Sequence, residues 1–433
     1  MLSSARRVRW LTLAGAVVAL FHPTQAAGAA DPCDNVESPG YPTHACKTAR
    51  LQARSFVVVA VVDTGINPYH VDFRLPPDGD MIGVHPSEYI EGYPASTPRL
   101  DLSFDVPSPA EGLQRDKAEW EKVGPGQMGW VNGTNLAGVI GFALWCRGVP
   151  TDCSVPPGVD IAGGHGTGSA SIAGGRIYGP GSSDILLVSI ESGDTGLAWA
   201  AQQPWIDVIT NSWTGITPGL DQTAEASYAA VASGKVVCFA SGNAPVPHWF
   251  WEGPGPSWNV NVGGVQASDR SEPPNYAWPN DVMGISHVPA AAHDSMDGQR
   301  EFGGTSAAAP AVCALIAKTI AAARSLLQDN VQGPHEDKAL AVGGLGSGFL
   351  SDGRLTRPEV EDAVQSTASA ESSTLPQAPW VRAGYGIVDQ ATIVDALKVI
   401  TGAMPRPLRP DEDRWVQTTD ALRNAVWGEP PPG

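Results

Sequence analysis

The chain has 433 residues, of which 42% are hydrophobic and 17% are charged, and its formal net charge is −18. This hydrophobic share excludes a disordered chain, and the 49 glycines and 38 prolines indicate long ordered loops on a buried scaffold. So acidic a surface disfavours binding to nucleic acid or to anionic membranes. We therefore expect a globular protein with no nucleic-acid partner.

The N-terminus is typical of an export signal. Three arginines lie within the first nine residues, and residues 10–21 form an apolar run that is too short to span a bilayer. Small residues suited to cleavage follow at 27–29. We predict a signal peptide over 1–29, secretion, and no stable membrane insertion after the signal is removed. The mature chain then keeps 24 basic and 45 acidic residues, a formal charge of −21. A buried helix of the fold is the alternative interpretation of the apolar run.

The six cysteines fit an exported protein. Cys33 and Cys46 lie close together in a polar segment, and Cys146 and Cys153 flank a short loop, so we predict a disulfide within each pair.

The remaining two cysteines lie in apolar surroundings. Cys238 falls in a strand-like run and Cys313 in a helix-like run, and we interpret both as buried free thiols. The sequence has no CxxC motif, no HExxH motif and no Cys/His cluster with zinc spacing. We therefore predict no catalytic metal.

The first third of the chain contains one clear strand. Residues 30–54 form a short polar extension rich in turn-forming residues. The run 56–62 is β-branched, apolar on both faces and ends at Asp63, as in a central strand of a covered parallel sheet. Residues 75–131 are rich in proline, glycine and charge with little periodicity, which predicts a surface insertion.

Strands and alanine-rich helices alternate along the rest of the chain, which indicates a parallel sheet. We expect strands at 136–145, 185–190, 208–209, 236–240 and 260–265, and helices at 197–203, 224–233 and 307–327. A glycine-rich second insertion covers 330–353, a helix begins near Thr356, and a proline-rich tail covers 402–433. The expected fold is α/β: a three-layer, doubly wound and mostly parallel sheet with helices on both faces, forming one catalytic domain over 55–401.

Three short motifs carry side chains suited to nucleophilic catalysis. Asp63 ends the buried strand in Val-Val-Asp-Thr-Gly, where a carboxylate needs a partner such as an imidazole. His165 is enclosed by glycines in Gly-Gly-His-Gly-Thr-Gly, which let backbone and substrate approach the ring. Ser306 opens an apolar helix after Gly-Gly-Thr, so the helix N-terminus favours a developing oxyanion. Each motif alone also fits a structural role: a hydrogen-bonded buried aspartate, a histidine at a helix start, and an N-cap serine.

A fourth motif, Phe-Ala-Ser-Gly-Asn, places Asn243 after a predicted strand, where it is either an oxyanion donor or an ordinary turn residue. The four motifs in this order resemble the subtilisin-like serine peptidases (subtilases), whose catalytic residues also follow the order Asp, His, Ser. Further similar runs are His-Val-Asp-Phe at 70–73, Asp-Val-Ile-Thr-Asn-Ser at 207–212 and Gly-Tyr-Gly-Ile-Val-Asp at 384–389. The resemblance covers about residues 55–400.

The resemblance implies a secreted serine endopeptidase that acts on polypeptides through an acyl-enzyme. In it, Ser306 is the nucleophile, His165 the general base and then acid, and Asp63 the residue that orients the imidazole. Asn243 supplies a side-chain donor to the oxyanion. One wall of the substrate site would pair with the substrate backbone and the other would line the specificity pocket. The first wall consists of Ser212, Trp213, Thr214 and Gly215, and the second of Ala240, Ser241 and Gly242.

The chain departs from the family pattern at several places. The insertion at 75–131 lengthens the gap between Asp63 and His165, and Thr214 stands where members often have glycine, so the pocket is expected to be narrowed. The His-Trp-Phe-Trp segment at 248–251 either lines a pocket or packs beneath the site. We expect a monomer that requires no cofactor. Structural calcium stays an open alternative without support, because the family's calcium sites cannot be placed in this sequence.

Two other classes of protein compete with this interpretation. Asp-Thr-Gly occurs at 63–65 and again at 194–196, as an aspartic peptidase would require, but that class is all-β and leaves His165 and Ser306 without roles. A binding protein with a subtilase fold and no activity is the second alternative, and the intact set of catalytic residues argues against it.

Many subtilases carry a separately folded prodomain before the catalytic domain. Residues 30–56 number only 27, and segments shorter than about 40 residues rarely fold alone. We therefore expect this segment to be a permanent extension of the catalytic domain and not a self-removed propeptide.

Overall fold

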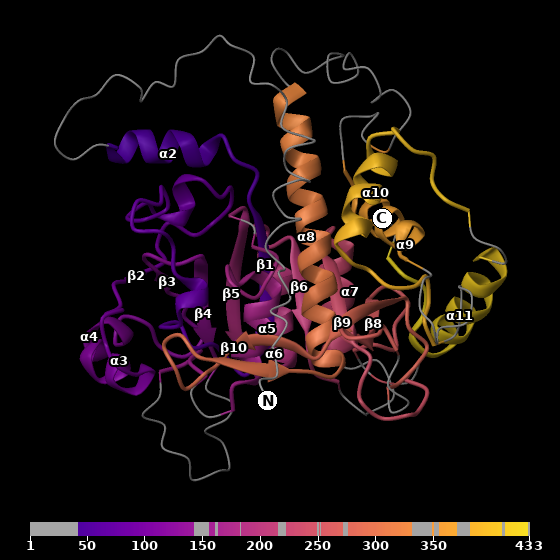
Figure 1. Ribbon diagram of the computed structural model, residues 1–433, viewed down its shortest axis with the longest axis horizontal. Coiled ribbons are helices and arrows are strands. Elements are labelled where there is room, and N and C mark those ends of the chain that lie inside the picture. Colours follow the sequence, from indigo (N-terminus) through magenta and orange to yellow (C-terminus); the bar gives the residue numbers. More distant parts are fainter. Residues whose placement is uncertain are drawn as a thin grey trace, which may run out of the picture. The chain divides into compact units, whose positions relative to one another are not determined.

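The computed structural model of the chain is drawn in Figure 1. It describes residues 42–142, 156–160, 163–181, 183–214, 222–248, 251, 253–271, 276–330, 349, 355–369, 382–408 and 412–431. The chain divides into two compact units, residues 1–46 and 47–433. In the first unit only residues 42–46 are described, and they include the start of helix α2 (His44–Gln52).

A seven-stranded parallel sheet lies at the centre of the second unit, in the order β4-β5-β1-β6-β7-β8-β9. Its strands are β1 (Val57–Asp63), β4 (Leu136–Gly141), β5 (Ile185–Glu191), β6 (Val208–Asn211), β7 (Val236–Ala240), β8 (Val260–Gln266) and β9 (Val282–Ser286). All seven residues of β1 are buried, as its continuous apolar run predicts. The carboxyl ends of these parallel strands share one edge of the sheet, which is where Asp63 lies.

Helices cover both faces of this sheet (Figure 1). On β1, Val57, Val59 and Val61 face one hydrophobic cluster while Val58 and Val62 face the other. The first cluster involves α5 (His165–Gly174), α8 (Thr305–Asn330), α9 (Arg357–Thr367) and α10 (Gln390–Ile400), and the second involves α6 (Asp194–Gln202) and α7 (Gln222–Ala232). The expected three-layer α/β fold is confirmed.

Helix α8 is the most apolar long helix in the described residues. Its segment Thr305–Leu327 is long and apolar enough to cross a membrane, but 78% of it is buried inside the protein. It packs along strands β6 to β9 and on α5, so it is a core helix. Pro310 is the sixth residue of α8 and cannot donate to the Ser306 carbonyl four residues before it, but the Ser212 hydroxyl donates to that carbonyl instead at 2.9 Å.

The interpretation of Cys238 and Cys313 as free thiols is wrong. They form a disulfide between β7 and α8, with Cα atoms 6.3 Å apart, within the usual range for a disulfide. Alternation along β7 turns Cys238 toward the face that α8 covers, a pairing that spacing in the sequence does not reveal. Cys46 is also disulfide-bonded, whereas Cys33, Cys146 and Cys153 lie outside the described residues.

Residues 75–131 are more than the surface insertion that their composition predicts. They form η2 (Pro86–Glu88), β2 (Arg99–Leu100), α3 (Pro109–Arg115), α4 (Lys117–Trp120) and β3 (Trp130–Val131), after the short helix η1 (Val71–Phe73). Leu100 and Trp120 are buried in the main core, and the Trp120 indole donates to the Tyr69 hydroxyl at 3.0 Å. Isolated buried side chains of this kind leave no periodic signal in the sequence.

The C-terminal part contains elements that the sequence did not predict. Strands β10 (Val288–Ala291) and β11 (Gln299–Phe302) form an antiparallel hairpin that leads into α8. The proline-rich tail contains helix α11 (Glu412–Trp427), in which Arg423 and Trp427 are buried.

Candidate active site

Asp63, at the carboxyl end of β1, accepts three hydrogen bonds through its carboxylate, one of them from the His165 imidazole. It is 6% exposed, and its Oδ1 accepts from His165 Nδ1 at 2.7 Å and from the Thr64 N–H at 2.8 Å. Its Oδ2 accepts from the Ser169 hydroxyl at 2.8 Å. These contacts fix the carboxylate and place the proton of the neutral His165 ring on Nδ1, which leaves Nε2 free to accept a proton.

His165 is the first residue of α5, and glycines on either side let it reach β1. Gly164 has φ of 73°, and a Cβ there would overlap Arg300 and His293. A Cβ at Gly166 would overlap the Gly65 carbonyl. Close approach of the two motifs therefore requires glycine at both positions.

The surroundings of His165 favour its protonated form. Burial alone lowers its pKa, but the hydrogen bond and charge of Asp63 and the charge of Asp160 outweigh burial, so the pKa of His165 is raised. The ring still has 40% of its side-chain surface exposed, so it remains accessible to a substrate.

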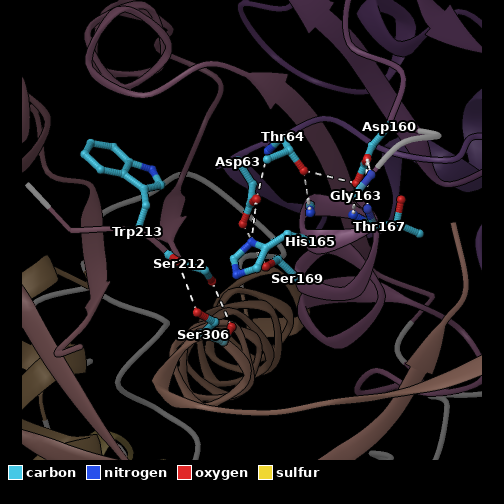
Figure 2. Close-up of polar contacts among 12 residues, drawn as sticks. Asp63, Thr64, Asp160, Gly163, His165, Thr167, Ser169, Ser212, Trp213 and Ser306 are labelled. Carbon is cyan, nitrogen blue, oxygen red and sulfur yellow. Dashed lines mark hydrogen bonds and ion pairs between the residues drawn. The ribbon is translucent and has the colours of Figure 1, made fainter. Parts of the chain in front are cut away.

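Asp160 is a second buried carboxylate that the motifs did not point to. Its Oδ1 accepts from the N–H groups of Gly163 and Gly164 at 3.2 and 3.0 Å. Its Oδ2 accepts from the Thr64 hydroxyl at 3.1 Å, and that hydroxyl accepts from the Gly166 N–H at 2.9 Å. Asp160 thus joins the turn after Asp63 to the turn that presents His165 (Figure 2).

Ser306 lies at the N-terminus of α8, and His165 lies between it and Asp63 (Figure 2). Its hydroxyl donates to the Ser212 carbonyl at 3.2 Å, and the Ser212 hydroxyl donates to the Ser306 carbonyl at 2.9 Å. This pair of contacts fastens the start of α8 to the end of β6. The helix N-terminus supplies unpaired N–H groups and a partial positive charge at this point.

Asn243 is held by the residue before Ser306. Its Oδ1 accepts from the Thr305 N–H at 2.9 Å and from the Thr305 hydroxyl at 3.1 Å. The same hydroxyl accepts from the Gly242 N–H at 3.0 Å. Because the amide oxygen is engaged by Thr305, the Nδ2 donors of Asn243 are left to face other groups.

The residues expected to form the two substrate walls come at the carboxyl ends of the neighbouring strands β6 and β7. Ser212 is at the end of β6, and Trp213 donates from its indole to the Val62 carbonyl at 3.0 Å and packs edge-on against Phe239. Thr214 follows and is half-buried, while Gly215 lies outside the described residues. On the other wall the three residues Ala240, Ser241 and Gly242 are all buried.

The aromatic segment after Asn243 packs beneath this second wall. Trp251 lies so close to Gly242 that a Cβ on this glycine would overlap its ring. His248 is fully buried, and burial first and the charge of Arg423 second lower its pKa to about 3. Trp249 and Phe250 lie outside the described residues, so the alternative of a pocket lining stays a prediction for them.

Within the described part of the chain, no three His, Cys, Asp or Glu side chains gather as a metal site would require. Asp194, in the second Asp-Thr-Gly, is the first residue of α6 and accepts from the Thr223 hydroxyl at 2.6 Å. The aspartic-peptidase alternative predicts an all-β protein, and the parallel α/β sheet shows that it is wrong.

The α/β fold, together with a serine, a histidine and an aspartate at the carboxyl edge of its sheet, is that of a serine-type peptidase. The family model described as "Subtilase family" matches residues 54–364, and the chain therefore belongs to this family. The order of the motifs had predicted this membership, which is confirmed.

Solved structures and curated proteins give two further comparisons. The crystal structure of a cold adapted subtilisin-like serine proteinase is 20% identical, with a TM-score of 0.44 over 78% of this chain and 91% of the other. The crystal structure of a lanthipeptide protease is 14% identical, with a TM-score of 0.47 over 81% of this chain and 90% of the other. A search of curated proteins gives no match.

Proposed function

We propose that this subtilase is an exported endopeptidase that cleaves polypeptides through Ser306, His165 and Asp63. The observation that carries the proposal is the 2.7 Å contact between Asp63 Oδ1 and His165 Nδ1, which leaves Nε2 on the side of Ser306. Asp63 then has the role of orienting the ring and stabilising its charged form.

Acylation would begin with rotation of the Ser306 hydroxyl from the Ser212 carbonyl toward His165 Nε2. The imidazole takes the proton while Oγ attacks the substrate carbonyl, and the resulting oxyanion is stabilised by the Ser306 N–H and by Asn243 Nδ2. His165 then passes the proton to the leaving amine. Water, activated by the same imidazole, releases the acyl group from Ser306.

The substrate would lie as an extended strand between the two walls. The chain from Ser212 to Gly215 would pair with its backbone, and Ala240 to Gly242 would form the opposite side. Export is supported by the basic and apolar N-terminal sequence and by the Cys238–Cys313 disulfide, because disulfides persist in oxidising compartments.

The test is labelling with a fluorophosphonate and hydrolysis of a mixed peptide library. Ser306→Ala should abolish both while circular dichroism shows an intact fold. Ser108→Ala is the matched control, since Ser108 caps the surface helix α3 and should leave labelling unchanged. Folded wild-type protein that neither labels nor cleaves would favour an inactive binding protein instead. Full activity in Ser306→Ala would remove Ser306 from the mechanism.

A further inference from the structure

Arg300 lies on β11, two residues before the aromatic ring that supports the catalytic histidine. The Phe302 ring contacts the His165 ring edge-on at a centroid distance of 5.2 Å, and the Arg300 guanidinium carbon is 6.0 Å from the Phe302 centroid. Arg300 Nη1 donates to the Gly163 carbonyl at 3.2 Å, beside the turn that carries His165. A guanidinium therefore borders the catalytic imidazole.

Arg300 places a positive charge beside His165 in a chain that is strongly acidic as a whole, with a formal charge of −18. Among the residues that the structure describes, the Gly163 carbonyl is its hydrogen-bond partner and no carboxylate forms an ion pair with it. The neighbouring Glu301 points to the other side of the strand, where His287 contacts it at 3.4 Å. Counted against the described residues alone, four of the five guanidinium N–H groups have no hydrogen-bond partner and can bind a ligand.

The position of Arg300 indicates which part of a substrate it would meet. In the proposed mechanism His165 delivers a proton to the leaving amine, so the residues after the scissile bond would pass the imidazole, which the β10–β11 hairpin borders through Phe302. In the proposed substrate pose, the residues before that bond would lie between the segments at the ends of β6 and β7, which contain Ser212 and Ala240. Arg300 belongs to the leaving-group side by this geometry.

We propose that Arg300 binds the carboxylate of an acidic substrate residue one to three positions after the scissile bond. This inference rests on the proposed function, because it assumes that His165 protonates the leaving amine. A guanidinium pairs with a carboxylate through two parallel N–H donors, which gives the contact direction as well as charge. The substrates preferred by this site are then peptides with Asp or Glu just after the cleaved bond.

The test uses quenched fluorescent peptides that differ only at the first three positions after the cleaved bond. Asp is compared with Asn, Glu with Gln, and Lys is included, at about 0.15 M salt so that long-range repulsion from the acidic surface is screened. Wild type should show kcat/KM about 3–10-fold higher for the acidic member of at least one pair. Arg300→Gln should remove this ratio, and Arg300→Glu should shift the preference to Lys.

Arg115→Gln is the matched control, since Arg115 is a half-exposed arginine that pairs with Asp105 on the surface. It should leave the ratio unchanged, and Arg300→Gln should not alter selectivity before the cleaved bond. A wild-type enzyme that cleaves without any acidic preference overturns the inference and leaves the proposed function intact. The inference is also overturned if Arg300→Gln slows all peptides equally, because Arg300 would then act only through Gly163. The kcat/KM ratios of the wild-type enzyme test the inference even where a variant fails to fold.

Discussion

Two buried carboxylates act on His165, and only one of them touches it. Asp63 contacts the imidazole, while Asp160 holds the turns on either side and contributes to the raised pKa of the ring. We therefore regard Asp160 as a positioning residue. Its effect should appear in the pH profile as well as in the rate.

In the proposed mechanism His165 must be neutral to accept a proton, so its raised pKa places the acid limb of kcat/KM above the ordinary pKa of about 6.5. Asp160→Asn removes one negative charge and should move this limb to lower pH. It also weakens hydrogen bonds to a charged acceptor, which contribute about 1.5–3 kcal/mol each, so kcat should fall by about 10–100-fold with little change in KM. Asp160→Glu, which keeps the charge, should keep the limb in place.

The control for this prediction is Asp184→Asn, since Asp184 pairs with Arg54 on the surface. It should change neither the limb nor kcat. The pH dependence of folding stability should be opposite to that of activity. Protonated His165 stabilises the folded state below about pH 6.5, and this contribution is lost as pH rises through the raised pKa of His165 in the folded state. If Asp160→Asn lowers the melting temperature but leaves the acid limb in place, Asp160 has only a structural role.

Asn243→Ala tests the oxyanion donor separately. We expect kcat to fall by about 10²–10³-fold with little change in KM, a magnitude carried over from the corresponding donor in subtilisin. Thr305→Val should produce a smaller loss of the same kind, because the Thr305 hydroxyl holds the amide oxygen at 3.1 Å. Steady-state kinetics on one peptide separate kcat from KM. An increase in KM alone would place Asn243 in substrate binding.

Residues whose role lies in a short contiguous motif could be predicted from the sequence. The structure joins Asp63 to His165 by a hydrogen bond, and Figure 2 draws Ser306 on the other side of the ring from Asp63; the roles that the three motifs predict for them stay predictions. Asp160 and Arg300 carry no such signal, since each acts through backbone groups or through space. Arg300 follows His165 by 135 positions and reaches it only because the β10–β11 hairpin folds back.

At the scale of elements, helix α11 lies outside the residues 54–364 that the family model matches, yet its Arg423 side chain is buried against the catalytic domain. The Arg423 side chain is 2% exposed and pairs with Asp281 at 2.9 Å. It also donates to the carbonyls of Gly255, Pro256 and Asn259. These carbonyls follow Trp251, which packs against Gly242, so α11 supports the segment that we expect to form one wall of the substrate site.

Arg423→Met should destabilise the protein by about 3–5 kcal/mol, because it leaves Asp281 buried without its cation. The double variant with Asp281→Asn should recover part of this loss, since no lone charge is then buried. Leu422→Ala is the control on the same helix: Leu422 is 50% exposed, so the change should stay within about 0.5 kcal/mol. Urea unfolding measures all three. Equal stability of Arg423→Met and wild type would show that α11 does not brace this wall.

The elements with regular apolar runs were the predictable ones. Strands β1, β5 and β7 and helix α8 match their expected positions to within a few residues. Strands β9 to β11 were missed because they are short and contain Gly, Pro and charged residues. The sequence did not predict helix α11 because its buried face includes Arg423, a charged residue where an apolar one would be expected.

At the scale of the whole molecule, the N-terminal extension is partly helical and partly built into the catalytic unit. Composition predicted turns throughout 30–54, but α2 spans His44–Gln52. Leu51 is fully buried in the hydrophobic cluster on one face of the sheet. Lys47 Nζ donates to the Ile82 carbonyl at 3.1 Å, and Gln52 donates to the Glu88 carbonyl at 2.7 Å. Cleavage after Lys47 would remove the Lys47 contact, and only cleavage after Gln52 would remove all three.

We therefore expect the active exported enzyme to begin before Lys47 and to retain Cys46, without self-cleavage inside α2. Removing the buried Leu51 side chain alone should cost about 2–5 kcal/mol, which makes loss of the segment costly to the fold. N-terminal sequencing of the secreted active form measures the start directly, and secreted Ser306→Ala protein is the control that cannot process itself. The two should share one N-terminus. A start between Lys47 and Val57 in the active enzyme, absent from Ser306→Ala, would instead identify the segment as a propeptide that the enzyme removes from itself.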